Sequence, residues 1–393
     1  MKKSVKVLAA VAVLTGLSVN VFATNGDNLI GVGPTSRAMG GTGIAAPQDA
    51  ISAIFSNPAA LSQLEGSQFN FAGTYFAPKV EANVVSGMIT DWSGESQDAA
   101  YAVPAIGLSS PVNDKVTFGI AAYGVSGMGV DYRDMDISND MNTKVSVMKF
   151  VPAFAYKNGA FSYGAGLDID YQAADFGSGL SHNYAFGLRL GAAYEYEKWA
   201  FGLTYVTPQN VKHERVYDFD SNGTFDTLKL ENPAQYGAGV SYKGLDKWVL
   251  SADVKYLDWA NADGYSDFDW EGQTVYAIGV QNQTTDKLTL RAGWNYGKNP
   301  VKDHDGFNPM GSTDVQGTAM NTFGYEYFRV IGFPGITEHH LTLGAGYQFS
   351  PKFALNLGFK KAFATTIEET SSDGTIKSEL SETAYDLGLT FKF

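Results

Sequence analysis

The sequence predicts an all-β protein, a transmembrane antiparallel β-barrel of about 14 strands whose lumen holds an N-terminal plug, or hatch. Three observations predict it. The chain begins with an export leader. Long runs of residues alternate between apolar and small or polar side chains. The connections between these runs are alternately short and long, as in barrels of the bacterial outer membrane.

The leader occupies residues 1–23, and we expect the mature chain to begin at Thr24. Lys2, Lys3 and Lys6 precede an apolar stretch, and Ala23 closes a segment suited to signal peptidase. No later apolar run is as long as a transmembrane helix, which excludes helical insertion. The chain has no cysteine, so disulfides cannot stabilise the exported fold.

Composition fits a barrel with lipid outside and water inside. The chain has 44 glycines, 13% aromatic residues and a mean hydropathy of −0.14, because polar lumen-facing residues offset the apolar lipid-facing ones. The net charge is −13 and becomes about −16 when the three leader lysines are removed, which argues against nucleic acid as a partner. We expect residence in the outer membrane of a Gram-negative bacterium, in contact with its lipids.

The alternation is clearest in residues 341–349, Leu-Thr-Leu-Gly-Ala-Gly-Tyr-Gln-Phe, where every second side chain is apolar. Such runs are longer than the roughly five or six residues of a typical strand in a soluble protein. The last strand ends with Phe393 after an apolar stripe, which resembles the terminal strands that outer-membrane proteins present to their assembly machinery. We expect fourteen strands starting near Ser67, Asp98, Lys115, Thr143, Ala160, His182, Trp199, Lys229, Lys247, Gln273, Lys287, Glu338, Lys352 and Ile376.

The connections sort by length. Those after even-numbered strands are turns of a few residues, and those after odd-numbered strands are long. This parity is typical of periplasmic turns and extracellular loops, and it places both chain ends in the periplasm. The long connections are expected at residues 80–97, 127–142, 173–181, 208–228, 259–272, 299–337 and 366–375.

A hatch is expected because side chains cannot fill so wide a bore. Fourteen strands give a backbone radius of roughly 14 Å. Residues 24–66 precede the first strand, are rich in glycine and contain a helix-like stretch at about 48–55. The predicted organisation is therefore a leader (1–23), a hatch (24–66) and a barrel (67–393).

The hatch sequence carries a family resemblance. Residues 31–45 read Gly-Val-Gly-Pro-Thr-Ser-Arg-Ala-Met-Gly-Gly-Thr-Gly-Ile-Ala, and an Asn-Pro-Ala motif follows at Asn57, Pro58 and Ala59. Together with matching stretches at 253–259, 288–300 and 332–347, they resemble the long-chain fatty acid transporter (FadL) family, which includes aromatic-hydrocarbon channels. The resemblance covers both ends and the middle of the mature chain.

The resemblance implies passive uptake of hydrophobic small molecules, either long-chain fatty acids or hydrocarbons. Extracellular loops would capture the ligand, the hatch would rearrange, and the ligand would leave sideways near the third strand. The sequence has its own signs of a weak wall there, since prolines remove ladder donors and glycines tolerate bulges. Two interpretations of these residues are equally open: they form a lateral gap, or they only relieve crowded packing in a curved part of the wall. They are Pro104, Gly124, Gly127, Gly129 and Pro152.

Ligand-contacting residues are sought among lumen cations and loop aromatics. Fatty-acid-transporting relatives tend to place basic residues near the start of the tenth strand, but residues 270–279 contain none. Arg189, Lys255 and Arg291 are the lumen cations by parity, and they could contact a carboxylate or join ion pairs with Asp168, Asp170 or Asp253. The longest loop offers apolar side chains for capture or for packing onto the barrel mouth. These are Phe307, Phe323 and Phe328.

Other functions were weighed. An open general or structural porin is the main alternative. A lipolytic enzyme is disfavoured because none of the five histidines lies in a recognisable nucleophile motif. We therefore expect no enzyme activity and no cofactor. Asp218, Asp220 and Asn222 resemble half of a calcium loop, but Lys229 stands where the bidentate glutamate belongs, so an acidic turn is the first interpretation.

Overall fold

The computed structural model describes residues 25–135 and 141–393. The predicted leader lies outside the described residues. Within them, fourteen antiparallel strands form a closed barrel, because β19 pairs along its length with β1. No helix in the described part is long and apolar enough to cross a membrane. The barrel strands are β1 (Gln68–Ser86), β3 (Tyr101–Pro111), β4 (Val116–Asp131), β5 (Asn142–Asn158), β6 (Phe161–Asp175), β7 (Ser181–Tyr196), β8 (Trp199–Val206), β11 (Gln235–Tyr242), β12 (Trp248–Leu257), β13 (Gln273–Gln283), β14 (Leu288–Gly297), β17 (His339–Ser350), β18 (Phe353–Ser371) and β19 (Gly374–Lys392).

The period of two divides the barrel wall into an outer and an inner face. On β17, Leu341 and Leu343 are exposed on the outer surface, whereas His340 and Thr342 between them are buried inside. The same division holds on β7, where Phe186 is exposed. The alternation therefore assigned these faces correctly, because one face meets lipid and the other meets the lumen.

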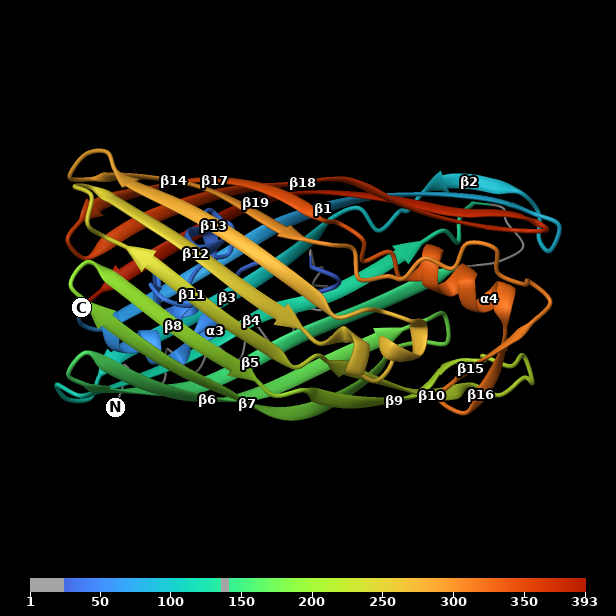
Figure 1. Cartoon of the computed structure of the whole chain (residues 1–393), viewed down its shortest axis with the longest axis horizontal. Coiled ribbons are helices and arrows are strands. Elements are labelled where there is room, and N and C mark those ends of the chain that lie inside the picture. The colour runs from blue at the N-terminus through green and yellow to red at the C-terminus, as the bar shows by residue number, and fades with distance from the viewer. Residues whose placement is uncertain (1–24, 136–140) are drawn as a thin grey trace.

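The two ends of the barrel differ. Figure 1 shows the C-terminus and the hatch helix α3 at one end, and the loop elements β2, α4, β9, β10, β15 and β16 at the other. By the rule that outer-membrane barrels place short turns in the periplasm, the loop end is the extracellular end. The loop elements are β2 (Trp92–Glu95), β9 (Gln209–Tyr217), β10 (Asp226–Asn232), η2 (Trp259–Asn261), η3 (Ser266–Phe268), β15 (Ser312–Val315), β16 (Thr318–Asn321), α4 (Thr322–Tyr327) and η4 (Phe328–Gly332).

Three predicted boundaries were wrong. The eighth barrel strand begins at Gln235, because Lys229 belongs to β10, which pairs only with β9 in a separate hairpin. The connection expected at 366–375 is a tight turn, because β18 and β19 stay paired out to Ser371 and Gly374. The first loop starts later than residue 80, because β1 pairs with β19 as far as Ser86. In each case residues beyond the bilayer continue to pair, which a pattern based on lipid contact cannot detect.

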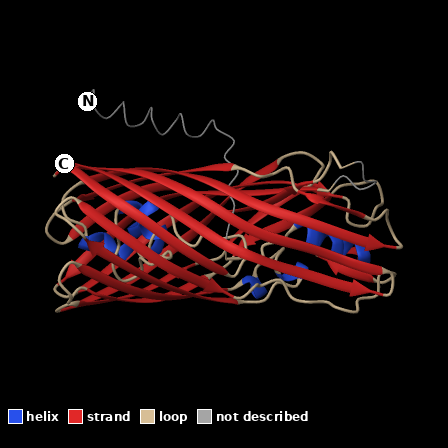
Figure 2. Ribbon diagram, turned by 90° about the horizontal axis from the view of Figure 1, so that it is seen from above, coloured by secondary structure: helices blue, strands red, loops and turns tan. Residues whose placement is uncertain are grey.

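Residues 25–66 lie inside the barrel and are almost entirely buried. They contain α2 (Pro34–Arg37), α3 (Ala50–Ser56) and η1 (Pro58–Gln63). Helix α3 begins with a capping box, in which Asp49 accepts from the Ser52 amide and the Ser52 hydroxyl accepts from the Asp49 amide. Figure 2 shows these short helices enclosed by the tilted strands.

Candidate functional site

The Asn-Pro-Ala motif fixes the hatch to the barrel wall. The Asn57 side chain caps η1 by accepting from the Ala59 amide at 3.0 Å. Its Nδ2 donates to the Ile44 carbonyl at 2.8 Å and to the Ala192 carbonyl of β7 at 3.1 Å. Strands β6 and β7 present Gly164 and Gly191 at this contact, where a Cβ would collide with the motif. The motif therefore works by close backbone approach to the wall.

Buried polar contacts hold the rest of the hatch body, which we define as residues 34–63. Arg37 forms an ion pair with Asp386 of β19 and donates to Thr74 of β1 at 2.7 Å. Asp253 of β12 accepts from the Gly43 and Ile44 amides at 2.8 and 3.0 Å. These bonds tie the hatch body to opposite sides of the barrel.

The hatch tip, residues 25–30, is attached differently. Its backbone bonds to β4, with the Leu29 amide donating to the Val125 carbonyl at 2.8 Å and the Gly127 amide donating to the Asp27 carbonyl at 3.1 Å. Asn28 and Ser126 are thereby bridge partners. The tip thus makes one isolated antiparallel bridge to β4.

Strand β4 loses its pairing with β3 where it meets the tip, while it stays paired with β5. Its ladder with β3 ends at the Ala105–Tyr123 pair. A bulge follows at Val125 on the β5 side, and residues 123–130 are buried on both faces. We call residues 123–130 the inward segment of β4, and Gly124, Gly127 and Gly129 all lie in it.

The two prolines flank this segment. Pro104 still pairs with Gly73 of β1, but it lies just beyond the last residue of β3 that pairs with β4. Pro152 faces Ile120 of β4, and the ladder between β5 and β6 is interrupted at residues 151–152. The five residues predicted from the sequence therefore gather around one stretch of wall.

The lumen cations occupy three different environments. Arg189 forms an ion pair with Asp168 at 2.9 Å. Lys255 makes no ion pair within 4.0 Å among the described residues, and its Nζ lies 3.4 Å from the Ile30 carbonyl of the hatch tip. Arg291 donates to Gln281 at 2.8 Å and lies 3.3 Å from Asn356. Of the three, only Arg189 forms the expected ion pair.

Sequence reasoning missed two further lumen cations among the described residues, and one of them is Lys360 of β18, which forms a buried ion pair with Glu382 at 2.9 Å. The other is Lys149. Lys149 of β5 is buried and bonds to Asp168 and Asp170 at 3.2 and 3.1 Å. Its inner-face neighbours are Val147 and Val151, so the inner face of β5 is as apolar as an outer face. The alternation of apolar and polar residues along β5 therefore did not show that this lysine faces the lumen.

The barrel interior leaves little free space. A cavity of about 20 Å³ lies beneath the hatch tip, between Leu29, Phe55, Val125, Arg189 and Lys255. A second cavity of about 20 Å³ lies between the inward segment of β4 and the inner face of β1. Each has room for about one water molecule. Two larger hollows of about 720 and 660 Å³ are open and lie among the outer strand ends and on the outer wall.

The comparison with known protein families identifies the kind of protein that this plugged fourteen-stranded barrel is. The family model described as outer membrane protein transport protein (OMPP1/FadL/TodX) matches residues 11–183 and 179–307. The chain belongs to this family. It is therefore an outer-membrane β-barrel, and its family consists of transport channels.

Individual relatives of the FadL/TodX family are distant. A 47 kDa outer membrane protein of Pasteurella multocida (strain Pm70) is 21% identical over 243 residues, which are 53% of this chain and 51% of that protein. The chain thus spans about half the length of this curated relative. The solved FadL homologue of Pseudomonas aeruginosa has a TM-score of 0.71 at 16% identity, covering 96% of this chain and all of that one. The Pseudomonas putida toluene transporter TodX has a TM-score of 0.67 at 18% identity, covering 92% and 99%.

At the extracellular end of this family member, the loops pack into an aromatic cap. Phe328 is 1% exposed, and its ring centroid lies 4.9 Å from Phe268 and 5.5 Å from Phe176. Phe323 is 7% exposed and stacks on Tyr327, whereas Phe307 is partly buried at the edge. In this conformation the loop aromatics pack onto the barrel mouth.

The hairpin of β9 and β10 extends this cap. His213 is buried and lies 2.9 Å from the side-chain oxygen of Gln172 on β6. Burial lowers the pKa of His213 to about 4, so it is neutral at pH 7. At the hairpin tip, Asp218 and Asp220 accept hydrogen bonds from the Asn222 amide at 2.9 and 3.1 Å. These residues form a polar turn, and calcium binding there stays a prediction.

Proposed function

We propose that the protein takes up hydrophobic small molecules, long-chain fatty acids or hydrocarbons, by passive diffusion gated by the hatch. The poor hydration of the ligand drives its entry. The ligand is captured by the extracellular loops and leaves sideways at the inward segment of β4. The observation that carries the proposal is that the hatch tip bonds directly to this segment.

The small interior cavities support a gate. Sites for small molecules usually have volumes of roughly 300–1,000 Å³, whereas the cavity under the tip holds about 20 Å³. A ligand can occupy this position only if the tip moves. Displacing the tip also uncovers the place where β4 has no pairing with β3, so one motion enlarges the cavity and opens the wall.

The proposal also assigns the chain's parts and partners. In this proposal the chain is divided into a leader (1–23), a hatch (24–66) and a barrel (67–393). Lumen cations Arg189, Lys255 and Arg291 and loop residues Phe307, Phe323 and Phe328 are its ligand-binding candidates. Outer-membrane lipids surround the barrel, and the assembly machinery recognises the strand ending at Phe393.

A reversible lock tests the gate. Asn28 and Ser126 are bridge partners of the non-hydrogen-bonded kind, whose Cα atoms are typically about 4.5 Å apart, a spacing that a disulfide can bridge. The chain has no native cysteine, so an Asn28→Cys/Ser126→Cys pair forms a single disulfide. We expect the oxidised form to take up labelled ligand at least about tenfold more slowly and dithiothreitol to restore uptake. Unchanged uptake by the oxidised form contradicts a moving tip.

The exit is tested in the same assay with Gly124→Trp, which fills the inward segment of β4. The matched control is Gly73→Trp, because Gly73 on β1 has open space where a side chain would stand. We expect Gly124→Trp to block uptake and Gly73→Trp to leave it unchanged, with both proteins assembled in the membrane. Normal uptake by Gly124→Trp rules out this exit, and large steady ion conductance by the native protein favours an open porin.

A further inference from the structure

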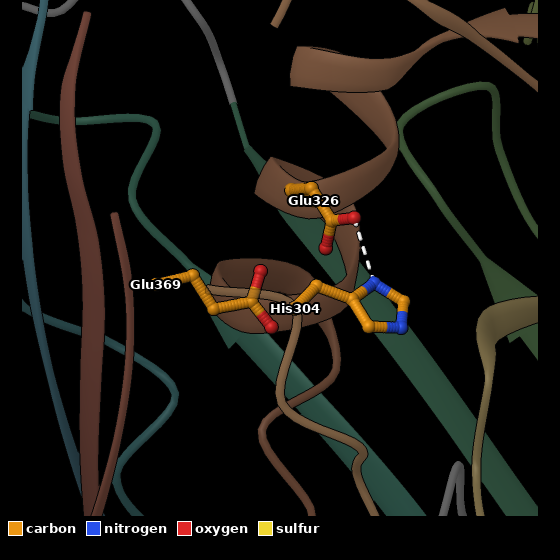
Figure 3. Close-up of side chains that lie close together, drawn as sticks. All are labelled: His304, Glu326 and Glu369. Carbon is orange, nitrogen blue, oxygen red and sulfur yellow. Dashed lines mark hydrogen bonds and ion pairs between the residues drawn. The ribbon is translucent and has the colours of Figure 1, made fainter. Parts of the chain in front are cut away.

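A buried cluster at the extracellular end joins the longest loop to the barrel wall. Glu326 lies on α4, His304 precedes it in the same loop, and Glu369 lies near the outer end of β18. One potential ligand atom from each of the three residues lies within 4.8 Å of the others. Figure 3 shows the three side chains converging from separate elements.

Arg329 occupies only one side of the two carboxylates. Its Nε donates to Glu326 Oε2 at 2.8 Å, and its Nη2 donates to Glu369 Oε1. The second oxygen of Glu326 lies 2.8 Å from His304 Nδ1. The second oxygen of Glu369 has no hydrogen-bond partner in the described parts of the chain, although its side chain is fully buried. A buried ionised carboxylate oxygen without a partner is costly, and either a proton or a bound cation relieves this cost.

The other nitrogen of His304 is already oriented. Its Nε2 lies 3.0 Å from Asp269 Oδ2, in the loop between β12 and β13. Metal-bound histidines commonly donate the proton of the non-ligating nitrogen to a carboxylate, which fixes the tautomer. A proton on Nε2 leaves the Nδ1 lone pair directed at Glu326.

Charge and ligand chemistry point to the kind of ion. When both glutamates are ionised, as metal ligands are, they and the one guanidinium carry a net charge of −1, and Asp269 adds another, so a divalent cation compensates both. One imidazole nitrogen with two carboxylate oxygens is a ligand set typical of zinc, whereas calcium and magnesium prefer oxygen alone. His304 keeps a 17% exposed side chain, which leaves access for water as a fourth ligand.

We propose that His304, Glu326 and Glu369 form a binding site for a divalent transition-metal ion of the zinc type. The ion clamps the loop of α4 to β18 and so fastens the extracellular cap to the wall. This site does not depend on which molecule the barrel transports. The exposed group of Asp218, Asp220 and Asp226 has oxygen ligands only and serves as the comparison.

The test uses the full-length protein in detergent after treatment with a chelator. Titration calorimetry with Zn²⁺ is expected to give one ion per chain, with affinity at least tenfold weaker in Glu369→Gln and in His304→Asn. The matched control Asp220→Asn is expected to bind like the native protein. Heat-modifiable migration in electrophoresis verifies that each variant is a folded barrel.

A second measurement covers the case in which a variant does not assemble. X-ray absorption at the zinc edge of the native protein is expected to show nitrogen and oxygen neighbours including one imidazole. The proposal is overturned if the native protein binds no zinc at micromolar concentration, if binding survives in both Glu369→Gln and His304→Asn, if Asp220→Asn abolishes it, or if the spectrum lacks imidazole.

Discussion

The hatch body and the hatch tip lie in the same lumen but are held by different chemistry. The body is fixed by a buried ion pair from Arg37 to Asp386, by Asp253 accepting from two amides, and by Asn57. The tip is held by two backbone bonds to β4, by a hydrogen bond from Tyr265 to Asp27 and by Lys255, whose Nζ lies 3.4 Å from the Ile30 carbonyl. Two buried amide atoms of the tip, Asn25 Oδ1 and Asn28 Nδ2, have no hydrogen-bond partner among the described residues.

This difference indicates which part of the hatch can be displaced at the lower cost in free energy. Breaking a buried ion pair by losing one partner costs about 3–5 kcal/mol. Each buried polar atom without a partner costs roughly 1–3 kcal/mol, so the tip carries a penalty that displacement into water relieves. We therefore expect the body to stay in place and the tip to move.

The largest expected effect comes from removing the anchor of the body. Arg37→Ala leaves Asp386 buried without its cation, and we expect the free energy of unfolding to fall by about 3–5 kcal/mol. Urea unfolding in lipid vesicles measures the change. The matched control Arg133→Ala breaks an exposed pair with Asp131, where the arginine side chain is 54% exposed, and is expected to cost less than about 1 kcal/mol. Equal effects of the two variants contradict the anchor.

A smaller effect is expected from loosening the tip. Tyr265→Phe removes the hydroxyl that donates to Asp27, which costs roughly 1–3 kcal/mol locally. We expect hydrogen exchange of the Leu29 and Gly127 amides to accelerate about tenfold, the effect of roughly 1.4 kcal/mol, while global stability changes little.

The control for the tip variant is Tyr325→Phe, since the Tyr325 hydroxyl donates to the Asp267 carbonyl at 3.0 Å and lies in the capping loops. It should leave exchange in the tip unchanged. If Tyr265→Phe destabilises the whole barrel as Arg37→Ala does, the tip is not an independent unit.

The smallest effect concerns the ligand. Lys255 lines the cavity under the tip and has no ion pair within 4.0 Å in the part of the chain that the structure describes, so we expect it to pair with a ligand carboxylate. We expect Lys255→Met to slow uptake of a long-chain fatty acid by up to about tenfold, equivalent to roughly 1.4 kcal/mol, and to leave uptake of toluene unchanged. Lys79→Met, on the exposed outer end of β1, is the control. Equal slowing of both ligands indicates that Lys255 supports the structure instead.

Much of the fold could be predicted because its signal is local. Each strand that crosses the bilayer places one face in lipid. An apolar residue such as Leu341 next to a polar one such as Thr342 therefore indicates which face of the strand meets lipid and which meets the lumen. The helix expected near residues 48–55 is α3, which a capping box at Asp49 begins. The Asn57 motif was found by resemblance, but its contact with Ala192 belongs to the folded barrel.

By itself the sequence determined the barrel and its fourteen strands. Only the tertiary structure decided that the hatch tip pairs with β4, that Lys149 is a lumen cation, and that His304, Glu326 and Glu369 meet. The reason is physical. Periodicity reports what each residue faces along its own strand, whereas these contacts join segments tens to hundreds of residues apart, and closure of the barrel brings them together.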